Sequence, residues 1–369
     1  MLLGKNGKMT RDQIQLIHDT YAGKKVFLTG HTGFKGSWLL CWLRHLNAIV
    51  KGYSLNPDFE NSLYTQVDGD ARCQSVIADI RDTEKVREEI LSFKPDFIFH
   101  LAAQPLVRYS YQEPVETFNT NIMGTVHVLD AVRYLNQDCS VILITTDKVY
   151  ENQEWIYPYR EHEPLGGFDP YSASKGACEL IINSYRRSFF QSDSKDFKKA
   201  IASARAGNVI GGGDWASDRI IPDLVRAFSK HETLAIRNSF AVRPWQHVLD
   251  PLFGYLLLGA KMRLAPSRFS EAWNFGPYAE DSLTVRQLVE LTQKYWQGEV
   301  VYMDEKNQPH EAGLLKLDIN KAITKLGWYP HFSSEQSIQK TIEWYKAVIE
   351  VGEPAHVWVE KQILQYENQ

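Results

Sequence analysis

A tyrosine and a lysine lie four positions apart in the run Tyr171-Ser-Ala-Ser-Lys175. In a helix, residues i and i+4 share one face, so the ammonium group would lie beside the phenol and favour its ionised form. The pKa of the phenol, ordinarily near ~10, would then move toward neutrality. The pattern predicts that Tyr171 acts as a base that removes a proton from an alcohol. The spacing alone leaves an alternative open, in which a surface tyrosine lies beside a solvated lysine.

Glycines at three-residue spacing follow a short apolar run near the start of the chain. The run Lys25-Val-Phe-Leu-Thr29 predicts a strand, Gly30-His-Thr-Gly33-Phe-Lys-Gly36 a tight turn, and residues 37–46 an apolar helix. Such a turn lets a pyrophosphate approach the N–H groups and positive dipole of the helix N-terminus. We therefore expect a dinucleotide here, although the spacing is G-x-x-G-x-x-G rather than G-x-G-x-x-G.

Strand and helix patterns alternate through the first two hundred residues. The expected strands are 48–53, 72–78, 96–101 and 140–145, and the expected helices are 82–93, 114–135 and 171–190. This alternation implies right-handed crossovers and a parallel sheet covered on both faces. We predict an α/β fold with a doubly wound parallel (Rossmann) sheet over residues 24–206, preceded at 1–23 by an arm or short helix.

The regular alternation weakens from about Gly207. Glycines at 211–213 and the runs 242–250 and 273–277 interrupt shorter helices and strands. We therefore assign residues 207–369 mainly to a smaller C-terminal lobe that binds the substrate, with some segments returning to the Rossmann domain.

Composition is typical of a globular protein in an aqueous compartment. The chain has 369 residues, of which 44% are hydrophobic and 23% charged, and its net charge of -4 argues against nucleic acid as a partner. We expect no signal peptide and no membrane span, because no apolar stretch approaches ~20 residues. The cysteines lack C-x-x-C spacing, so we interpret them as reduced packing residues and expect no metal; they are Cys41, Cys73, Cys139 and Cys178.

Thr146 and Asp147 directly follow the expected strand 140–145. In an open parallel sheet, ligands bind outside the carboxyl ends of the strands, so these side chains should face the same crevice as Tyr171 and the glycine turn. A Thr-Asp pair is also a common turn or helix cap, and its position between the turn and Tyr171 favours the functional interpretation.

These motifs together resemble the extended short-chain dehydrogenase/reductase superfamily, over nearly the whole chain from Gly30 to the Leu326-Gly-Trp328 segment. Within it, the Thr146-Asp147 pair is similar to that of the sugar-nucleotide 4,6-dehydratases. Three runs, at 30–39, 206–215 and 243–249, look like those of the family members that act on CDP-glucose.

The resemblance implies a lyase reaction in three stages on a bound nicotinamide. Tyr171, assisted by Lys175, would take the proton of the glucose 4-hydroxyl while hydride leaves C4. Water would then leave across C5 and C6 with Asp147 protonating the 6-hydroxyl, and the hydride would return to C6. Thr146 would hold the 4-oxygen in place. The product would be CDP-4-keto-6-deoxy-D-glucose.

Lys148 departs from the commoner pattern of the family, in which a glutamate follows the aspartate and takes the C5 proton. A lysine acts as that base only when it is neutral, which requires burial or a nearby cation such as Lys175. The alternative is that Lys148 stabilises the enolate electrostatically while another group moves the proton.

The resemblance also implies the contacts of the cofactor. The phosphate turn comprises Gly30, Gly33, Phe34, Lys35 and Gly36, and the adenine contacts are Asp79 and Ile80. The residues near the nicotinamide ribose are Leu101, Ala102, Ala103 and Gln104, and Thr120, Tyr171 and Lys175 are further matching positions. The second strand ends Gly52-Tyr-Ser-Leu-Asn56 without an acid to bind a ribose 2′-hydroxyl. We expect NAD, and the residues leave NADP open.

For the nucleotide sugar, Asn208 and Arg243 match positions that contact the diphosphate and nucleotide in relatives, and Arg suits phosphate because its planar group donates two hydrogen bonds at once. The resemblance places Gln104 and Arg108 near the hexose, and His310 and Trp245 at the base pocket. Arg243 as a plain surface charge and Trp245 as a core residue are the alternatives.

Two alternatives to this function stay open. An NAD-dependent nucleotide-sugar 4-epimerase keeps the Tyr-Lys pair but needs no acid at Asp147, and a dehydratase of another NDP-hexose differs only in the base. A non-catalytic dinucleotide sensor would have lost residues that are present here. The resemblance further implies a cytoplasmic homodimer or higher homo-oligomer in deoxysugar biosynthesis, such as that of the lipopolysaccharide O-antigen.

Overall fold

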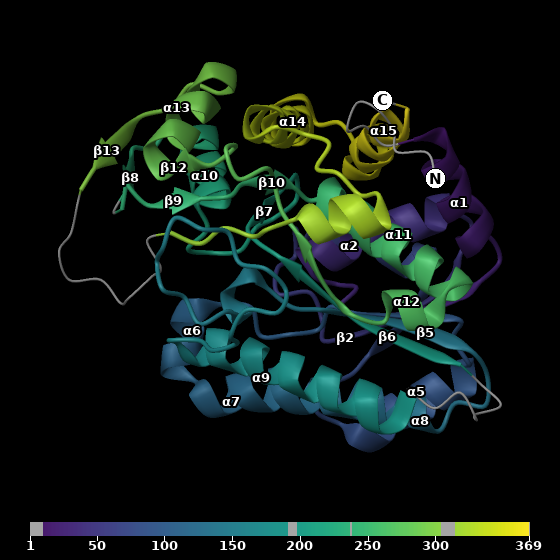
Figure 1. The fold of residues 1–369 in the computed structure, drawn as a ribbon. Helices are drawn as coiled ribbons and strands as arrows, with labels where there is room; N and C mark the ends of the chain where they lie inside the picture. Colours follow the sequence, from purple (N-terminus) through teal and green to yellow (C-terminus); the bar gives the residue numbers. More distant parts are fainter. Residues whose placement is uncertain (1–9, 191–197, 237, 304–313, 369) are drawn as a thin grey trace.

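The computed structural model describes residues 10–190, 198–236, 238–303 and 314–368. Its centre is a seven-stranded parallel sheet in the order β11-β6-β5-β4-β1-β2-β3 (Figure 1). The strands are β1 Lys25–Thr29, β2 Ile49–Ser54, β3 Gln74–Ile77, β4 Phe97–His100, β5 Cys139–Ile144, β6 Lys199–Ala206 and β11 Ala272–Phe275. Six of them follow the 3-2-1-4-5-6 order of a doubly wound sheet, so the predicted fold class is confirmed.

The central strands are apolar runs without alternation, as a sheet covered on both faces requires. Every residue of β4, β5 and β6 is buried. The apolar side chains form two clusters, one on each face, and the larger contains Trp38, Trp42 and Trp273. All four cysteines are free, and Cys41, Cys139 and Cys178 are buried among apolar neighbours.

One face of the sheet is covered by the lower helical layer of Figure 1. It comprises α5 Thr83–Phe93, α6 Val107–Gln112, α7 Pro114–Phe118, the π-helical turn η1 Asn119–Met123, α8 Gly124–Arg133, α9 Pro170–Tyr185 and η3 Arg186–Phe190. The sequence predicted one helix over 114–135, whereas the structure widens it into a π turn at η1. Asn121 of that turn is buried and donates to the Ser174 hydroxyl at 2.8 Å, a long-range contact that helix periodicity cannot reveal.

The opposite face carries the helices drawn above the sheet in Figure 1. They are α1 Arg11–Tyr21, α2 Phe34–His45, α3 Leu63–Gln66, α4 Gly69–Arg72, α11 Leu249–Leu264, α12 Pro266–Phe269, η4 Ala322–Leu326 and α15 Ala355–Glu367. The N-terminal segment is therefore helical from Arg11, and α1 packs on α11, which in turn packs on β5. α11 is buried over most of its length, which fits its apolar composition.

The remaining elements lie beyond the carboxyl ends of β4, β5 and β6 (Figure 1). They are α10 Ile220–Ser229, α13 Val285–Tyr295, α14 Ser334–Lys346, η5 Ala347–Val351 and the strand pairs β7 Val209–Ile210 with β10 Gln246–His247, β9 Val242–Arg243 with β12 Leu283–Thr284, and β8 Leu234–Ile236 with β13 Val300–Tyr302. The run at 273–277, which the sequence placed among irregular segments, instead begins in β11 at the edge of the main sheet. The boundary at residue 206 stays a prediction.

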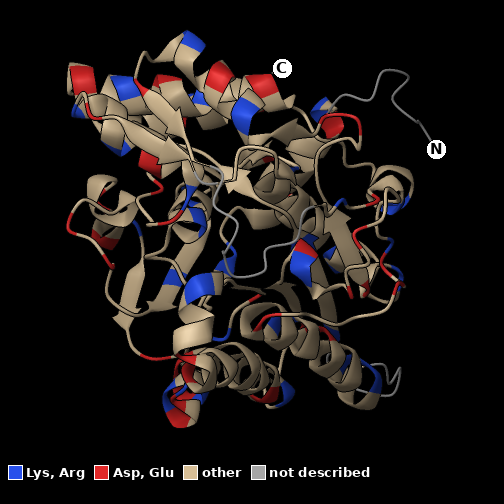
Figure 2. Cartoon of the chain, turned by 90° about the vertical axis from the view of Figure 1, so that its left-hand side faces the viewer, with Lys and Arg blue, Asp and Glu red and all other residues tan. Residues whose placement is uncertain are grey.

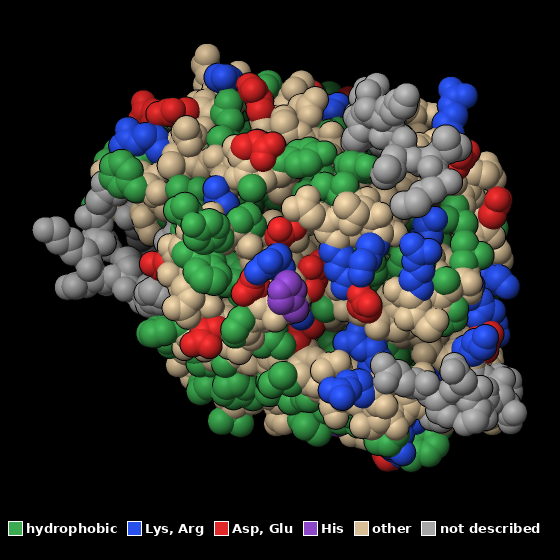
Figure 3. Space-filling model, viewed as in Figure 1, with side chains coloured by type: hydrophobic (Ala, Val, Ile, Leu, Met, Phe, Trp, Pro, Cys, Tyr) green, Lys and Arg blue, Asp and Glu red, His purple; other side chains and the backbone are tan. Residues whose placement is uncertain are grey.

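Charges of both signs are distributed over the molecule. On the face shown in Figure 3, basic and acidic side chains are interspersed with hydrophobic ones. Figure 2 shows the molecule from the side. Several Lys and Arg residues lie in the middle of this view, between the lower helical layer and the upper elements. None of the described helices combines the length and apolar character that crossing a membrane requires.

Candidate active site

Thr146 and Asp147 lie where β5 ends, as the sequence predicted. A single 3-10 turn, η2 Asp147–Val149, begins here, and the Thr146 side chain caps it by accepting the Lys148 backbone N–H at 3.4 Å. The same hydroxyl donates to Asp147 Oδ1 at 2.9 Å. Both side chains are buried, so this hydrogen bond forms where water does not compete with it.

The Asp147 carboxyl favours its protonated form more than an exposed aspartate does. Burial raises its pKa, while the positive charges of Lys148 and Arg243 and the hydrogen bond from Thr146 act in the opposite direction. The net upward shift makes Asp147 a better proton donor near neutral pH than an ordinary aspartate.

Helix α9 positions Tyr171 and Lys175 one turn apart. Asp169 caps the helix by accepting the Ser172 backbone N–H at 2.9 Å, and Pro170 occupies the first turn, where its missing N–H costs nothing. The Tyr171 N–H donates to Ser110 Oγ at 3.1 Å, and the Tyr171 phenol lies close enough to Thr146 for that side chain to lower its pKa. Thr146 therefore lies beside both the tyrosine and the aspartate.

The Tyr171 phenol does not show the lowered pKa that the spacing predicted. Burial raises its pKa, and the counteracting influences are the hydrogen bond with Thr146 and the charge of Arg219. The Lys175 ammonium donates to the Ile144 carbonyl at 3.3 Å, and burial lowers its pKa. Burial therefore outweighs the i,i+4 relationship in setting the pKa of the phenol.

Lys35 reaches further into the site than a phosphate turn requires. Burial and the charges of Arg219 and Lys175 lower its pKa to about 7, and the charge of Asp147 opposes this. Its ammonium also donates to the Tyr255 hydroxyl at 3.4 Å. Lys35 thus interacts with the catalytic candidates, which its place in the glycine turn did not predict.

The glycine turn is built so closely that side chains would not fit at two of its positions. A Cβ at Gly30, whose φ is +74°, would lie 2.7 Å from the Ala102 nitrogen, and one at Gly36 would lie 2.0 Å from the Gly30 oxygen. Gly33 caps α2 without a side-chain hydrogen bond, and the first turn of α2 carries no acid. These features fit an anion at the N-terminus of α2, so the turn suits a dinucleotide pyrophosphate.

The residues expected at the adenine end are ordered by local contacts. The Asp79 carboxylate accepts from the Arg81 guanidinium, with the shortest contact at 2.6 Å, and this pairing lowers its pKa. Ile80 is buried, and its carbonyl contacts His127 Nδ1 at 3.0 Å. At the end of β2, Ser54 Oγ lies 2.8 Å from Thr32 Oγ1.

The expected nicotinamide side follows β4. Thr29 Oγ1 accepts the backbone N–H groups of Leu101 and Ala102, each at 3.1 Å, which holds this loop against β1. The next residues, Ala103 and Gln104, are partly exposed, and Thr120 is half-buried in η1. The Gln104 amide donates to Thr117 Oγ1 at 2.9 Å and to the Leu106 carbonyl at 3.1 Å, so it braces the loop.

Two segments of the C-terminal half meet at Asp147. A Cβ at Gly207 would lie 3.1 Å from Asp147 Oδ2 and 3.5 Å from Pro244. The adjacent Asn208 accepts the Gln246 N–H through its carbonyl at 3.3 Å, in line with the β7–β10 pairing. Arg243 is close enough for its charge to lower the pKa of Asp147. The predicted substrate residues Asn208 and Arg243 therefore approach the predicted catalytic ones.

The other substrate candidates have different surroundings. Arg108 forms a partly exposed ion pair with Asp218 at 3.2 Å. Trp245 is buried within the larger core cluster, which agrees with the core alternative. His310 lies outside the described residues.

Sequence reasoning missed Arg219, whose charge acts on both Tyr171 and Lys35. Its guanidinium is held by Asp214 Oδ2 at 2.8 Å. Arg219 follows the glycine run at 211–213 by a few residues, and this was the only hint in the sequence. A single arginine before a helix does not show which side chains it will contact.

Comparison with known proteins places the chain among nucleotide-sugar enzymes. Residues 27–341 match the family model described as GDP-mannose 4,6 dehydratase. The CDP-glucose 4,6-dehydratase of Salmonella typhimurium is 47% identical over 348 residues, covering 94% of this chain and 97% of that protein. The CDP-paratose 2-epimerase of Salmonella typhi is 26% identical, covering 88% and 100%.

Solved structures show the same fold at lower identity. The UDP-glucose 4-epimerase of Thermotoga maritima superposes with a TM-score of 0.74 at 24% identity, covering 88% of this chain and 99% of that one. The dTDP-glucose 4,6-dehydratase of Bacillus anthracis, solved in complex with NAD, has a TM-score of 0.71 at 20% identity, covering 88% and 97%.

Proposed function

The chain belongs to the GDP-mannose 4,6-dehydratase family, and we propose that it converts CDP-D-glucose to CDP-4-keto-6-deoxy-D-glucose and water. The relative with 47% identity over 94% of the chain supports CDP-glucose as the substrate. One structural observation carries the reaction type. The buried Asp147 carboxyl, with its raised pKa, accepts a hydrogen bond from the Thr146 hydroxyl, and Thr146 and Asp147 both lie near enough to the Tyr171 phenol to influence its pKa.

Tyr171 takes the proton of the 4-hydroxyl in the first step. The charge of Arg219 favours the phenolate that this step needs, against the cost of burial. A bound NAD would supply the acceptor and later the donor of the hydride. Thr146 positions the 4-oxygen through its hydroxyl. Lys175 holds its ammonium at the end of β5 through the Ile144 carbonyl.

Asp147 protonates the departing 6-hydroxyl once the 4-ketone has made C5–H acidic. The raised pKa of Asp147 keeps a proton available, and the Thr146 hydroxyl orients the carboxyl group. A 4-epimerase does not expel the 6-hydroxyl of its substrate and needs no such acid. The position of Asp147 therefore supports dehydration over epimerisation.

Lys148 acts electrostatically in this proposal rather than as the C5 base. Its side chain lies close enough to Asp147 for a positive charge there to lower the pKa of the carboxyl group. A fixed positive charge at this position also stabilises the enolate that forms when the C5 proton passes to a water molecule.

Substrate contacts come from both halves of the chain. Arg243 near Asp147, and Asn208 beside Gly207, suit the diphosphate, and Gln104 in the loop after β4 and Arg108 in α6 suit the hexose. His310 is proposed from the sequence alone. A guanidinium binds a diphosphate through two parallel hydrogen bonds, so Arg243→Lys should raise KM more than it lowers kcat.

NAD is the proposed cofactor. The glycine turn fits a pyrophosphate, and solved neighbours of the same fold contain NAD. Because β2 ends in Ser54 rather than an acid, titration with NAD and with NADP under identical conditions is the deciding measurement. Tighter binding of NADP would contradict the proposal.

The purified protein incubated with NAD and CDP-glucose should form a 4-keto-6-deoxy product, detected by its absorbance in alkali. Conversion to CDP-galactose without that product would identify an epimerase and overturn the proposal. Parallel reactions with dTDP-, UDP- and GDP-linked hexoses test the base, and the highest kcat/KM is expected for CDP-glucose. The homo-oligomeric state, the cytoplasmic location and a role in O-antigen biosynthesis stay predictions, the first testable by light scattering.

A further inference from the structure

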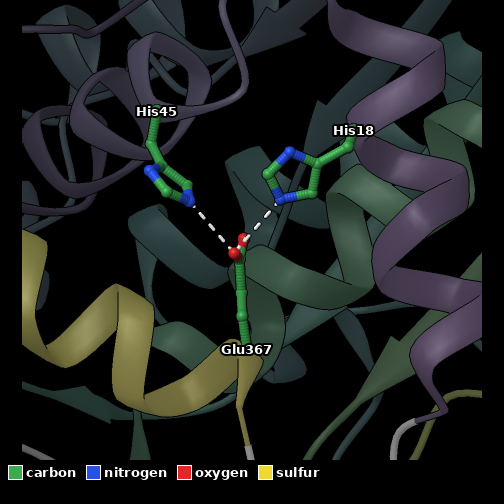
Figure 4. A group of neighbouring side chains, drawn as sticks. All are labelled: His18, His45 and Glu367. Carbon is green, nitrogen blue, oxygen red and sulfur yellow. Dashed lines mark hydrogen bonds and ion pairs between the residues drawn. The ribbon is translucent and has the colours of Figure 1, made fainter.

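Three side chains far from the Tyr171 site converge on one point. His18 Nε2 lies 3.1 Å and His45 Nε2 lies 3.0 Å from the same oxygen, Glu367 Oε2 (Figure 4). The three ligand atoms all lie within 4.8 Å of one another. His18 and Glu367 are 349 positions apart, so the sequence could not have suggested the cluster.

The cluster lies where three helices end. His18 is in the last turn of α1, His45 is the last residue of α2, and Glu367 is the last residue of α15. A helix C-terminus carries a negative partial charge and favours a cation. Glu367 adds a full negative charge there, and only 7% of its side chain is exposed. The negative potential of the three helix ends and of Glu367 favours a cation at this position.

We propose that His18, His45 and Glu367 bind one Zn²⁺ ion, with a water molecule as the fourth ligand. Two imidazoles and one carboxylate are a ligand set that zinc prefers, and hard cations such as Mg²⁺ do not. In a tetrahedral zinc site, bond lengths near ~2.05 Å place neighbouring ligand atoms roughly 3.3 Å apart. The two present N···O distances need to widen slightly to reach that value, and the two Nε2 atoms, which lie within 4.8 Å of each other, must take up the same spacing.

The surroundings match those of a metal ligand set. Trp42 Nε1 donates to the other carboxylate oxygen, Glu367 Oε1, at 2.7 Å, which fixes the orientation of the carboxylate. The side chains of His18 and His45 are 32% and 27% exposed, so an ion can enter from solvent. Any proton on the two Nε2 atoms passes to solvent when zinc binds. Zinc bound here joins the first and last described helices to α2.

The test uses the full chain without an affinity tag, freed of metal by chelation. We expect one Zn²⁺ per chain, measured by competition with a chromophoric chelator, and a rise in melting temperature with Zn²⁺ but not with Mg²⁺. Co²⁺ in place of zinc should give the intense visible absorption of a four-coordinate site. Glu367→Gln, His18→Gln and His45→Gln should each weaken binding at least about tenfold, the lower end of what loss of outer-shell partners alone costs.

His356→Gln is the matched control, because it removes a partly exposed histidine of α15 from outside the cluster. It should bind zinc as the parent does. Each variant is compared with its own metal-free melting temperature, so a change in basal stability does not obscure the result. Zinc binding that is absent, or that survives Glu367→Gln unchanged, or that falls equally in His356→Gln, overturns the proposal.

Discussion

The buried carboxylate of Glu179 accepts a hydrogen bond from the Arg205 guanidinium at 2.8 Å. Its two oxygens also accept from Thr145 Oγ1 at 2.6 Å and from Ser203 Oγ at 2.7 Å. Glu179 lies one turn beyond Lys175 on α9, while its partners lie on β6 and just after β5. This network fixes the helix that carries Tyr171 against the strand end that carries Thr146.

Removing one partner of this pair should be costly. Glu179→Ala leaves the Arg205 charge buried and unpaired, and we expect it to lower the free energy of unfolding by about 3–5 kcal/mol, measured by urea denaturation. Glu88→Gln, in the exposed pair with Lys85, should change it by less than about 1 kcal/mol. Equal effects of the two substitutions would show that the buried network does not hold α9 in place.

Tyr171 and Asp147 should fail at different steps. Tyr171→Phe should lose hydride transfer from C4 and slow turnover at least ~10²-fold, whereas Asp147→Asn should still reduce the cofactor and exchange the C5 proton but lose dehydration. Single-turnover absorbance of the reduced cofactor and isotope exchange at C4 and C5 separate the steps. Tyr134→Phe, with an exposed ring, is the control and should be unaffected. Identical losses in both variants would contradict separate roles.

Lys148 can be tested through charge and basicity separately. Arginine keeps the positive charge but does not give up its proton, so Lys148→Arg should retain activity at least about tenfold above that of Lys148→Met. Solvent exchange at C5 is the direct readout. If both variants lose that exchange to the same extent, Lys148 is the base and the electrostatic proposal is wrong.

The glycine turn offers a matched pair of substitutions. Gly36→Ala forces a Cβ to within 2.0 Å of the Gly30 oxygen and should cost about 1–3 kcal/mol of stability. Gly33→Ser keeps stability, because serine is a good N-cap and φ there is -78°, but its side chain takes the N–H groups that a pyrophosphate would use. We expect Gly33→Ser to weaken NAD binding at least about tenfold by calorimetry. Unchanged affinity would place the cofactor elsewhere.

The His45–Glu367 contact should make stability depend on pH when a chelator is present. The hydrogen bond that His45 donates to Glu367 and the charges of Glu367 and Glu360 raise the pKa of His45, and His18 is its other titratable neighbour. The contribution is therefore complete below the unfolded pKa of about 6.5 and is lost as pH rises through the higher folded pKa. His45→Gln should cost about 1 kcal/mol near pH ~5.5 and less near pH ~9. A cost that does not change with pH would contradict this.

Local sequence patterns predicted the strands and helices that carry the site. β1 matched its apolar run, and α9 begins at Pro170, one residue before the predicted start at Tyr171. The parallel, doubly wound sheet followed from the alternation of strands and helices, and the positions of Thr146 and Asp147 at a strand end followed from it in turn.

Long-range relationships could not be predicted in the same way. The approach of Lys35 to Asp147, the effect of Arg219 on Tyr171 and the pKa of the phenol all depend on burial that three distant segments create together. The π turn at Asn121 depends on partners at Gln104 and Ser174. Sequence spacing describes neighbours on one helix, whereas these contacts exist only after the sheet and both helical layers have assembled.

The main sheet is complete only after its edge strand β11 has been synthesised. Residues 272–275 pair with 203–206 of β6, so the last strand of the sheet is translated well after the others. Until a ribosome has released that segment, β6 presents an apolar edge with open N–H and C=O groups, which another nascent chain can pair with. Synthesis halted between residues 206 and 272 should therefore yield an aggregation-prone fragment that depends on chaperones.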